Sequence, residues 1–300
     1  MCAWQRRSCR RQAAPGTMLT EADAVSETEH ITPERSVLRV KGVRRVSPAE
    51  ERGLYMLDLA HPGWEKWRGG QFFMLRPLSW GGELLWARPF SICMAAGDTL
   101  SVFFQAAGRG TDRMSGLVPG DEVMVWGPLG NGFAVEPERR TFLLAGGIGI
   151  APFAEYVRLH PAPGNVSMLF CHRPPLSCYP AADLLQKAIR FASNREMDGS
   201  GLERSLALTD EALASAKACG GLVLACGPMP YLRHVWQKAM DIGARVQLSL
   251  ENRMACGVGA CLGCVAKTTP HWSKAGLPAQ VCTKGPVFWA EDLDLNGEKQ

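Results

Sequence analysis

Residues 141–160 read TFLLAGGIGIAPFAEYVRLH, and this stretch decides the fold. The apolar run at 141–145 predicts a buried strand, the glycines at 146–149 predict a turn, and 151–160 predicts a helix. A glycine turn between a strand and a helix lets a diphosphate approach backbone N–H groups. The G-x-G-x-x-G fingerprint is absent, so a purely structural turn stays open at this point.

Downstream of this stretch, apolar strand patterns alternate with helical patterns. Strands are predicted at 165–173, 201–208, 221–228 and 245–251, and helices at 182–192, 210–220 and 229–243. Such alternation is typical of βα units around a parallel sheet. We therefore predict a dinucleotide-binding α/β domain over residues 137–250.

Upstream, the pattern is that of a β domain. Six short segments with period-two alternation are bounded by glycine, proline and aspartate, at 36–47, 53–60, 70–78, 87–95, 99–108 and 121–130. Many short strands with regular turns predict a barrel or a sandwich. We place an antiparallel β-barrel at 34–136. Residues 1–33 are rich in arginine and then acidic, with few large apolar side chains, and predict a disordered extension.

Composition excludes several classes of function. Hydrophobic residues make up 46% of the chain, as in soluble globular proteins. No apolar run approaches the roughly 18 residues that span a bilayer. The net charge of +4 comes from four arginines near the start, Arg6, Arg7, Arg10 and Arg11, so no basic nucleic-acid face is indicated. We expect neither a membrane nor a nucleic acid as partner.

Four of the eleven cysteines have the spacing of a metal site. Cys256, Cys261 and Cys264 form a C-x4-C-x2-C run, and Cys282 follows at a distance. Plant-type ferredoxins hold a 2Fe–2S cluster with this spacing. The glycines between the cysteines permit positive φ and let N–H groups turn toward the sulfides. The four cysteines therefore predict a small 2Fe–2S segment over residues 251–300.

Other interpretations of these cysteines stay open. Zinc is one, although zinc sites usually pair two separated C-x2-C knuckles rather than crowding three ligands on one glycine-rich loop. Plain buried thiols or disulfides are another. The start of the chain has arginines with no apolar core behind them, which does not indicate a signal peptide. A reducing cytoplasm suits thiolate ligands, and we expect the protein there.

Three further motifs lie in the predicted β domain. They are Arg88-Pro89-Phe90-Ser91, Gly108-Arg109-Gly110-Thr111 and the glycine loop GPLGNGF at 127–133. An arginine can pair with a diphosphate, a serine can reach a flavin ring edge, and a glycine-rich helix start can bind an anion. Each motif is weak alone. Together and in this order, they make the chain resemble the ferredoxin–NADP⁺ reductase superfamily.

The resemblance implies a bound FAD and a set of residues that contact it. That set comprises Arg88, Pro89, Phe90, Ser91, Phe103, Phe104, Gln105, Gly110 and Thr111. Gln105 stands where relatives often have a basic residue, which puts one phosphate or ribose contact in doubt.

The same resemblance assigns two motifs to a pyridine dinucleotide. They comprise Gly146, Gly147 and Gly149 of the glycine turn, and Cys226, Gly227, Pro228 and Met229 near the nicotinamide. The segment at 198–201 matches the D-G-S-x-G that precedes another strand in the superfamily. Arg173 could reach a 2′-phosphate, which would favour NADP, or it could face solvent. We expect NAD.

A barrel, a dinucleotide domain and a C-terminal cysteine run, in this order, are similar to the electron-transfer subunits of dihydroorotate dehydrogenase B. The similarity covers residues 36–282. It implies a heterotetramer with an FMN-containing catalytic subunit that oxidises dihydroorotate in pyrimidine biosynthesis. Electrons would pass through the 2Fe–2S cluster and FAD to NAD⁺, and no catalytic side chain would be needed on this chain.

Two alternatives remain beside this resemblance. The flavin and 2Fe–2S subunits of NADH-dependent ferredoxin–NADP⁺ oxidoreductase and of sulfhydrogenase share the layout and differ mainly in their partner. The second alternative, from another class, is a zinc-bearing docking module on a reductase scaffold.

Overall fold

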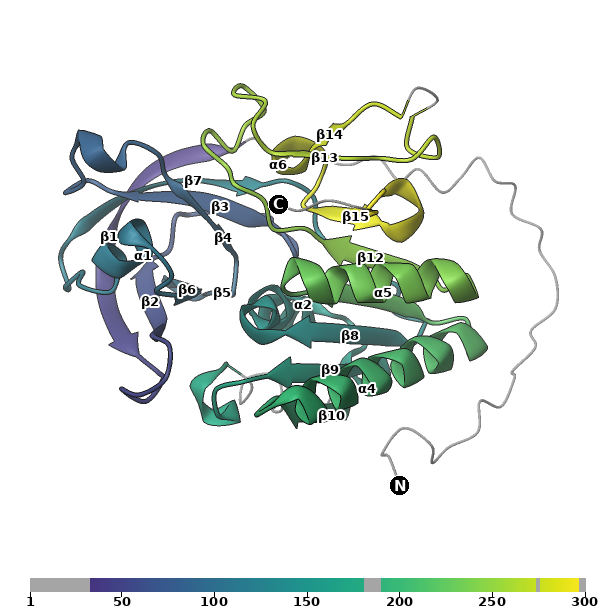
Figure 1. Cartoon of the computed structure of the whole chain (residues 1–300). Coiled ribbons are helices and arrows are strands. Elements are labelled where there is room, and N and C mark those ends of the chain that lie inside the picture. Colours follow the sequence, from purple (N-terminus) through teal and green to yellow (C-terminus); the bar gives the residue numbers. More distant parts are fainter. Residues whose placement is uncertain (1–32, 181–189, 274–275, 297–300) are drawn as a thin grey trace.

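The structure, a computed structural model, describes residues 33–180, 190–273 and 276–296. It consists of a curved antiparallel sheet, a second sheet flanked by helices, and an irregular C-terminal segment that contacts both (Figure 1). The predicted combination of a β unit, an α/β unit and a small C-terminal segment is confirmed. Almost all of the predicted disordered extension lies outside the described residues, as does most of the helix predicted at 182–192. No helix in the described part of the chain has the length and apolarity to cross a bilayer.

The first sheet contains seven antiparallel strands in the order β4-β3-β7-β1-β2-β6-β5. The strands are β1 (Glu34–Arg45), β2 (Leu54–Ala60), β3 (Phe72–Pro77), β4 (Arg88–Ser91), β5 (Met94–Ala96), β6 (Thr99–Gln105) and β7 (Glu122–Leu129). Each predicted β segment contains a strand, and the segment at 87–95 contains β4 and the start of β5. The sheet curls into an open barrel, with the short helix α1 (Arg109–Met114) at one end (Figure 1).

Side chains of β3 alternate between two cores, as the period of two requires. Phe73 and Leu75 point into the barrel core, where they join residues of β2 and β6. Phe72 and Met74 point the other way, into a core that includes the C-terminal segment. The outer face of β3 is therefore covered by residues that come much later in the sequence.

The second sheet has the strand order β10-β9-β8-β11-β12-β15. Five strands are parallel, namely β8 (Thr141–Gly146), β9 (Val166–His172), β10 (Arg190–Arg195), β11 (Leu222–Cys226) and β12 (Val246–Ser249). The sixth, β15 (Val287–Trp289), pairs antiparallel with β12. The predicted parallel sheet thus gains an antiparallel edge strand from the cysteine segment.

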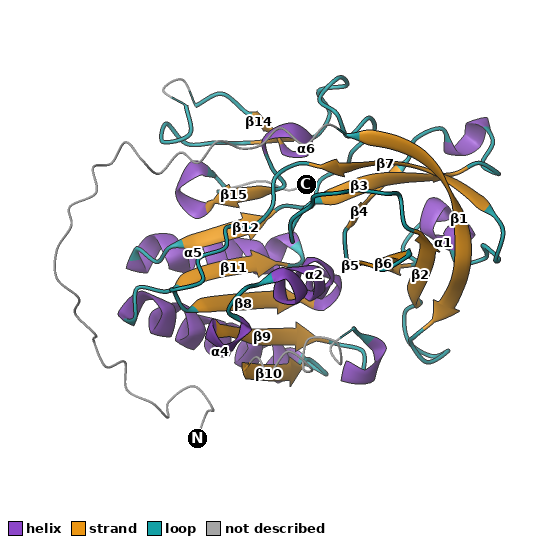
Figure 2. Cartoon of the chain, turned by 180° about the vertical axis from the view of Figure 1, so that it is seen from behind, coloured by secondary structure: helices purple, strands orange, loops and turns teal. Residues whose placement is uncertain are grey.

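Helices cover both faces of this sheet. On β8, Phe142 and Leu144 pack in the core beneath α4 (Gly199–Ala218) and α5 (Met229–Ile242). Leu143 and Ala145 face the opposite core, which contains α2 (Ala151–Leu159). Figure 1 shows α4 and α5 on one face, and Figure 2, seen from behind, shows α2 on the other.

The strand predicted at 201–208 is wrong, because these residues belong to α4. The Asp198 carboxylate accepts a hydrogen bond of 2.9 Å from the backbone N–H of Gly201, which is the usual way to start a helix. The D-G-S-x-G segment therefore opens a helix rather than preceding a strand. The end of the helix predicted at 182–192 is also wrong, since β10 begins at Arg190. β10 is a half-exposed edge strand with no apolar run to reveal it.

The chain reverses its direction across the sheet at β8. From β8 it moves outward to β9 and β10, then crosses back to β11 on the other side of β8. The carboxyl ends of strands at such a point form the usual ligand crevice of α/β sheets. In Figure 1 these carboxyl ends point toward the curved sheet. The strand ends that would border a ligand therefore lie on the side of the second sheet that faces the first sheet.

The C-terminal segment is held together by short elements. β13 (Val265–Ala266) pairs with β14 (Ala279–Gln280), and α6 (Val281–Lys284) follows and leads into β15. Because β15 extends the second sheet while Met74 of the first sheet packs in the same core, the segment is fixed against both sheets.

Candidate cofactor and metal sites

The four predicted cysteine ligands lie as two pairs. Cys256 Sγ is 3.4 Å from Cys261 Sγ, and the Cys264 thiol is near enough to Cys282 to raise the pKa of the Cys282 thiol. Cys261 is exposed, whereas Cys264 and Cys282 are buried. Within the described ranges, no three His, Cys, Asp or Glu side chains converge as a single metal ion requires. Two pairs of thiols match a two-iron cluster, in which each iron takes two thiolates.

The loop that carries Cys256 and Cys261 has a backbone conformation that favours glycine at two positions. Gly257 has φ +73° and Gly259 has φ +84°, the left-handed region that favours glycine. This conformation directs the N–H groups of Val258 and Cys261 toward Cys256 Sγ, at 3.5 and 3.4 Å. Burial opposes ionisation of Cys256, but these donors outweigh it and lower the pKa of the thiol to about 7.

The second pair is enclosed. Burial, together with the neighbouring Cys264 thiol, raises the pKa of Cys282 to about 12. The backbone N–H of Val281 donates to the Cys264 carbonyl at 2.6 Å, and the Gln280 side chain donates to the Gly259 carbonyl at 2.9 Å. These bonds hold the start of α6 against the cysteine loop, so the distant fourth cysteine is brought to the other three.

The cysteine loop lies directly on the curved sheet. A Cβ placed on Gly257 would be 2.5 Å from Met74 Cγ. The indole N–H of Trp126 on β7 donates to the Cys256 carbonyl at 3.1 Å. Met74 also stands opposite Pro89 of β4 in the sheet. A single strand, β3, therefore separates the cysteine loop from the Arg88–Ser91 motif.

The first two flavin motifs meet in the structure. The guanidinium of Arg88 lies 5.5 Å from the ring centroid of Trp80, and its Nη1 donates to the Trp86 carbonyl at 2.6 Å. A Cβ on Gly110 would be 2.9 Å from Arg88 Nε, so the helix start at α1 touches the arginine. The Thr111 hydroxyl accepts from the backbone N–H of Ala107 at 2.9 Å, which shapes the turn before α1.

The remaining predicted flavin residues divide into two groups. Pro89, Phe90 and Ser91 lie along β4 and are half-buried. Phe103 and Phe104 on β6 are buried in two different cores, and Gln105 at the end of β6 is half-buried. The two phenylalanine rings therefore support the sheet, and of the three residues only Gln105 is partly accessible to a ligand.

The two dinucleotide motifs are also brought together. Gly149 lies so close to the Cys226 carbonyl that any side chain at 149 would overlap it. A Cβ on Gly146 would be 3.1 Å from Pro228 Cδ. Gly147 has φ +54° and open space in front of its Cα. Glycines 146 and 149 are needed for packing, and glycine 147 leaves room for a ligand to approach the backbone.

The other members of this site follow β11. Cys226 is buried at the carboxyl end of the strand, and burial raises the pKa of its thiol, so the thiol stays neutral. Gly227 and Pro228 form the turn, and Met229 begins α5. Strand end, turn and helix start thus face the glycine turn across the reversal point of the sheet.

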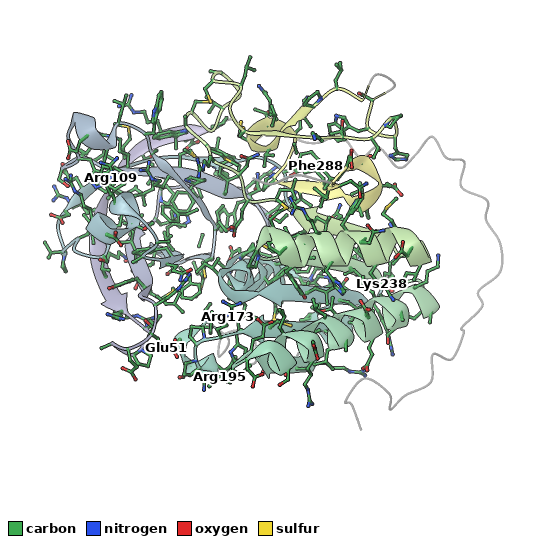
Figure 3. All side chains as sticks on the ribbon, in the orientation of Figure 1. Glu51, Arg109, Arg173, Arg195, Lys238 and Phe288 are labelled. Atoms are coloured by element: carbon green, nitrogen blue, oxygen red, sulfur yellow. The ribbon has the colours of Figure 1, made fainter. Side chains whose placement is uncertain are left out.

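Charged residues gather where β9 and β10 end. Arg173 has a side chain that is 75% exposed, with Nε 3.8 Å from Glu196 Oε2. Arg195 Nη2 lies 3.5 Å from Glu51 Oε1 in the loop between β1 and β2. Figure 3 shows Glu51, Arg173 and Arg195 at the same end of the second sheet. The ion pair of Arg195 joins the two sheets on this side.

Two residues that matter to this arrangement have no assigned role in the sequence prediction, although Asn131 lies in the glycine loop at 127–133. Asn131, in the loop after β7, donates to the Val287 carbonyl at 2.7 Å and accepts from the Val287 N–H at 3.0 Å. It thereby links the first sheet to β15. Glu155 on α2 is fully buried and contacts the first sheet. The sequence feature that points to Glu155 is a charged residue inside the otherwise apolar run FAEYV at 153–157.

Comparison with known proteins gives a consistent picture. Residues 251–294 match the family model described as the iron-sulfur cluster binding domain of dihydroorotate dehydrogenase B. The chain is 32% identical over 247 residues to the dihydroorotate dehydrogenase B (NAD(+)) electron transfer subunit of Clostridium acetobutylicum, covering 82% of this chain and 93% of the relative. It is 30% identical over 233 residues to the same subunit from Caldanaerobacter subterraneus, covering 76% of this chain and 90% of the relative.

Solved structures share the fold. One, of an NADH-dependent reduced ferredoxin–NADP oxidoreductase, aligns with a TM-score of 0.70 and 18% identity over 87% of this chain and 91% of the other. The ferredoxin–NADP⁺ reductase of Plasmodium falciparum aligns with a TM-score of 0.54 and 15% identity, over 69% of this chain and 89% of the other.

Proposed function

Because the chain belongs to the family of dihydroorotate dehydrogenase B electron transfer subunits, we propose that it passes electrons from a partner dihydroorotate dehydrogenase subunit to NAD⁺. The partner would hold FMN and oxidise dihydroorotate in pyrimidine biosynthesis. The two kinds of chain would assemble into a heterotetramer. The electrons would cross a 2Fe–2S cluster and an FAD on this chain. The substrate itself would not contact this chain.

The observation that carries this proposal is the position of the cysteine loop. The loop lies on the outer face of β3. Within the sheet, β3 pairs with β4, the strand that contains Arg88–Ser91. A cluster and a flavin held by these two elements would be separated by one strand. When all three groups are bound, nicotinamide exchanges two electrons as hydride, the cluster exchanges one, and a flavin exchanges with both.

The residues at the predicted flavin site fit a flavin dinucleotide. Arg88 supplies a cation beside the start of α1, where Gly110 leaves the backbone uncovered because a side chain there would strike the guanidinium. We propose that Arg88, Gly110 and Thr111 hold the diphosphate, and that β4 from Pro89 to Ser91 lies along the ring. Phe103, Phe104 and Gln105 would position the neighbouring strand.

The glycine turn fits a pyridine dinucleotide at the reversal point of the sheet. Gly146, Gly147 and Gly149 would receive the diphosphate, and Cys226, Gly227, Pro228 and Met229 would border the nicotinamide. The ends of β9 and β10 would then receive the adenosine ribose. Glu196 stands beside Arg173 there, and a carboxylate at this place favours a free 2′-hydroxyl over a 2′-phosphate. This supports NAD as the cofactor.

The arrangement of the thiols supports a cluster rather than zinc. Zinc sites usually pair two separated C-x2-C knuckles, whereas three of these cysteines share one C-x4-C-x2-C loop, and residues 251–294 match the iron-sulfur family model. N–H groups already point at Cys256 Sγ, as the electron-rich sulfurs of a cluster require. We propose a reducing cytoplasm as the location of the protein, because it suits thiolate ligands.

The test is anaerobic purification of the full chain with and without its candidate partner, followed by cofactor and activity analysis. The proposal predicts FAD, iron and sulfide on this chain, and reduction of NAD⁺ by dihydroorotate only when the partner is present. A large dehydrogenase subunit that does not oxidise dihydroorotate, or a hydrogenase subunit, as the co-purifying partner would favour the alternative oxidoreductases instead. A colourless protein that contains zinc would favour a docking module.

A further inference from the structure

Glu155 is a buried carboxylate that connects the two sheets. Its side chain is completely inaccessible to solvent and accepts two hydrogen bonds of 2.7 Å from Arg158, one turn further along α2. It also accepts from the indole N–H of Trp67 and, at 3.4 Å, from the backbone N–H of Ala95. Trp67 and Ala95 both belong to the part of the chain that forms the curved sheet.

Arg158 completes the same connection. Its Nη2 donates to the Ala95 carbonyl at 3.0 Å, so both backbone groups of Ala95 are bound by side chains of α2. The hydrogen bonds to Glu155 raise the pKa of the Arg158 guanidinium. The Arg158 guanidinium is therefore a permanently charged donor to the Glu155 carboxyl group.

Stability alone does not account for such a pair. Replacing a buried ion pair by apolar side chains of similar volume often leaves stability unchanged or higher. What the pair provides is a unique arrangement, because four donors from three separate segments must meet one carboxylate. Polar contacts of this kind fix how two surfaces meet, which apolar packing leaves adjustable.

The chain paths from this contact to the two cofactor motifs are short and buried. Ala95 follows Ser91 by four residues; of the residues between them, Ile92 and Cys93 are fully buried and Met94 is half-buried. Glu155 follows Gly149 by six residues and lies on α2, the helix that the glycine turn opens. A shift of α2 against β5 would therefore move the dinucleotide turn relative to the flavin strand by a similar amount.

We infer that Glu155 is a positioning residue, which holds the dinucleotide turn at a fixed place relative to the Arg88–Ser91 strand. This inference rests on the proposed function, because it concerns the approach of nicotinamide to flavin. Glu155 itself contacts neither motif. Glu155 would fix the orientation of nicotinamide relative to flavin for hydride transfer. A misplacement of two reacting groups by about 1 Å can slow such a step by about a hundredfold.

The test compares three variants of the full chain with its cofactors bound. Glu155→Gln keeps the size of the side chain and removes its charge. Trp67→Phe removes one donor and keeps an aromatic ring. Asp210→Asn is the matched control, because Asp210 pairs with His234 and Lys238 between α4 and α5, away from the first sheet.

Three quantities are measured for each variant. They are FAD content, the dissociation constant for NADH, and the rate of flavin reduction at saturating NADH. Glu155→Gln should reduce flavin about ten- to a hundredfold more slowly, with FAD content and NADH affinity unchanged. Trp67→Phe should give a smaller loss of the same kind, and Asp210→Asn none. In flavin-free protein, amide hydrogen exchange at Ala95 should accelerate in Glu155→Gln alone.

The outcomes separate the inference from the proposed function. If Glu155→Gln reduces flavin as fast as the wild type while exchange at Ala95 accelerates, the contact exists but positions nothing, and the inference is overturned. If Glu155→Gln does not fold, Trp67→Phe decides, and a wild-type rate in that variant overturns the inference. If the wild-type protein binds FAD but NADH cannot reduce it, the proposed function fails instead.

Discussion

Met74 and Gly257 are in contact across the boundary between the curved sheet and the cysteine loop. Met74 is fully buried on β3, and Gly257 presents its Cα to the Met74 side chain with φ +73°. Any side chain at residue 257 would both strike Met74 and occupy a backbone conformation that favours glycine. This contact sets how closely the cysteine loop approaches the sheet.

Gly257→Ala should therefore weaken the cysteine centre. The left-handed conformation costs an alanine about 1–2 kcal/mol, and the overlap with Met74 adds to that cost. We expect less iron per chain with unchanged FAD, measured by metal analysis and flavin absorbance. Gly63→Ala is the matched control, because Gly63 also has positive φ (+84°) but has open space in front of it. Equal iron in the two variants would show that the contact with Met74 is unimportant.

Cys261→Ser should abolish the cluster and leave the reduction of bound flavin by NADH largely intact. Cys261 is an exposed member of the first thiol pair, whereas the dinucleotide motifs lie on the other sheet. Iron content and stopped-flow flavin reduction measure the two effects separately. Cys219→Ser, at the end of α4, is the control for loss of a cysteine. If flavin reduction fell as far as iron content, the centre would be structural rather than a relay.

Arg88→Ala should lower the retention of FAD. Loss of a charge-assisted hydrogen bond costs about 1.5–3 kcal/mol, which corresponds to roughly ten- to a hundredfold weaker binding. The measurement is the FAD content after gel filtration and the dissociation constant on refilling. Arg113→Ala is the control, since Arg113 lies on the same short helix and pairs with Glu83 at the surface. Unchanged FAD affinity in Arg88→Ala would mean that the flavin site is elsewhere.

Glu196→Gln should shift the nucleotide preference toward NADPH. Removing the carboxylate leaves Arg173 available to a 2′-phosphate, and one charge-assisted hydrogen bond is worth about 1.5–3 kcal/mol, or roughly ten- to a hundredfold. The measurement is the ratio of kcat/KM for NADPH to that for NADH. Adding Arg173→Ala to the same chain should remove the gain. An unchanged ratio in Glu196→Gln would place the ribose away from these residues.

The motifs of this protein were readable from the sequence because their chemistry depends on local residue types. The strand, glycine turn and helix at 141–160 follow from an apolar run interrupted by Gly146, Gly147 and Gly149, and the structure has them as β8, η2 (Gly147–Ile150) and α2. The cysteine spacing predicted a centre at residues 251–300, in agreement with the family model that matches 251–294.

What the sequence did not reveal depends on contacts between distant segments. The pairing of β15 with β12 and the two hydrogen bonds of Asn131 to Val287 join parts that no local pattern relates. The strand predicted at 201–208 is wrong because these residues continue α4, whose start is set by the Asp198 cap outside that segment. The edge strand β10 has exposed side chains, so hydrophobic periodicity gave no sign of it.

The most direct test of the account is the electron paramagnetic resonance spectrum of the anaerobically purified chain, recorded before and after dithionite reduction. The proposed function predicts a paramagnetic 2Fe–2S signal after reduction, lost in Cys261→Ser and accompanied by bound FAD in both proteins. A reduced wild-type sample that shows no such signal, with zinc held by the four cysteines, would contradict it.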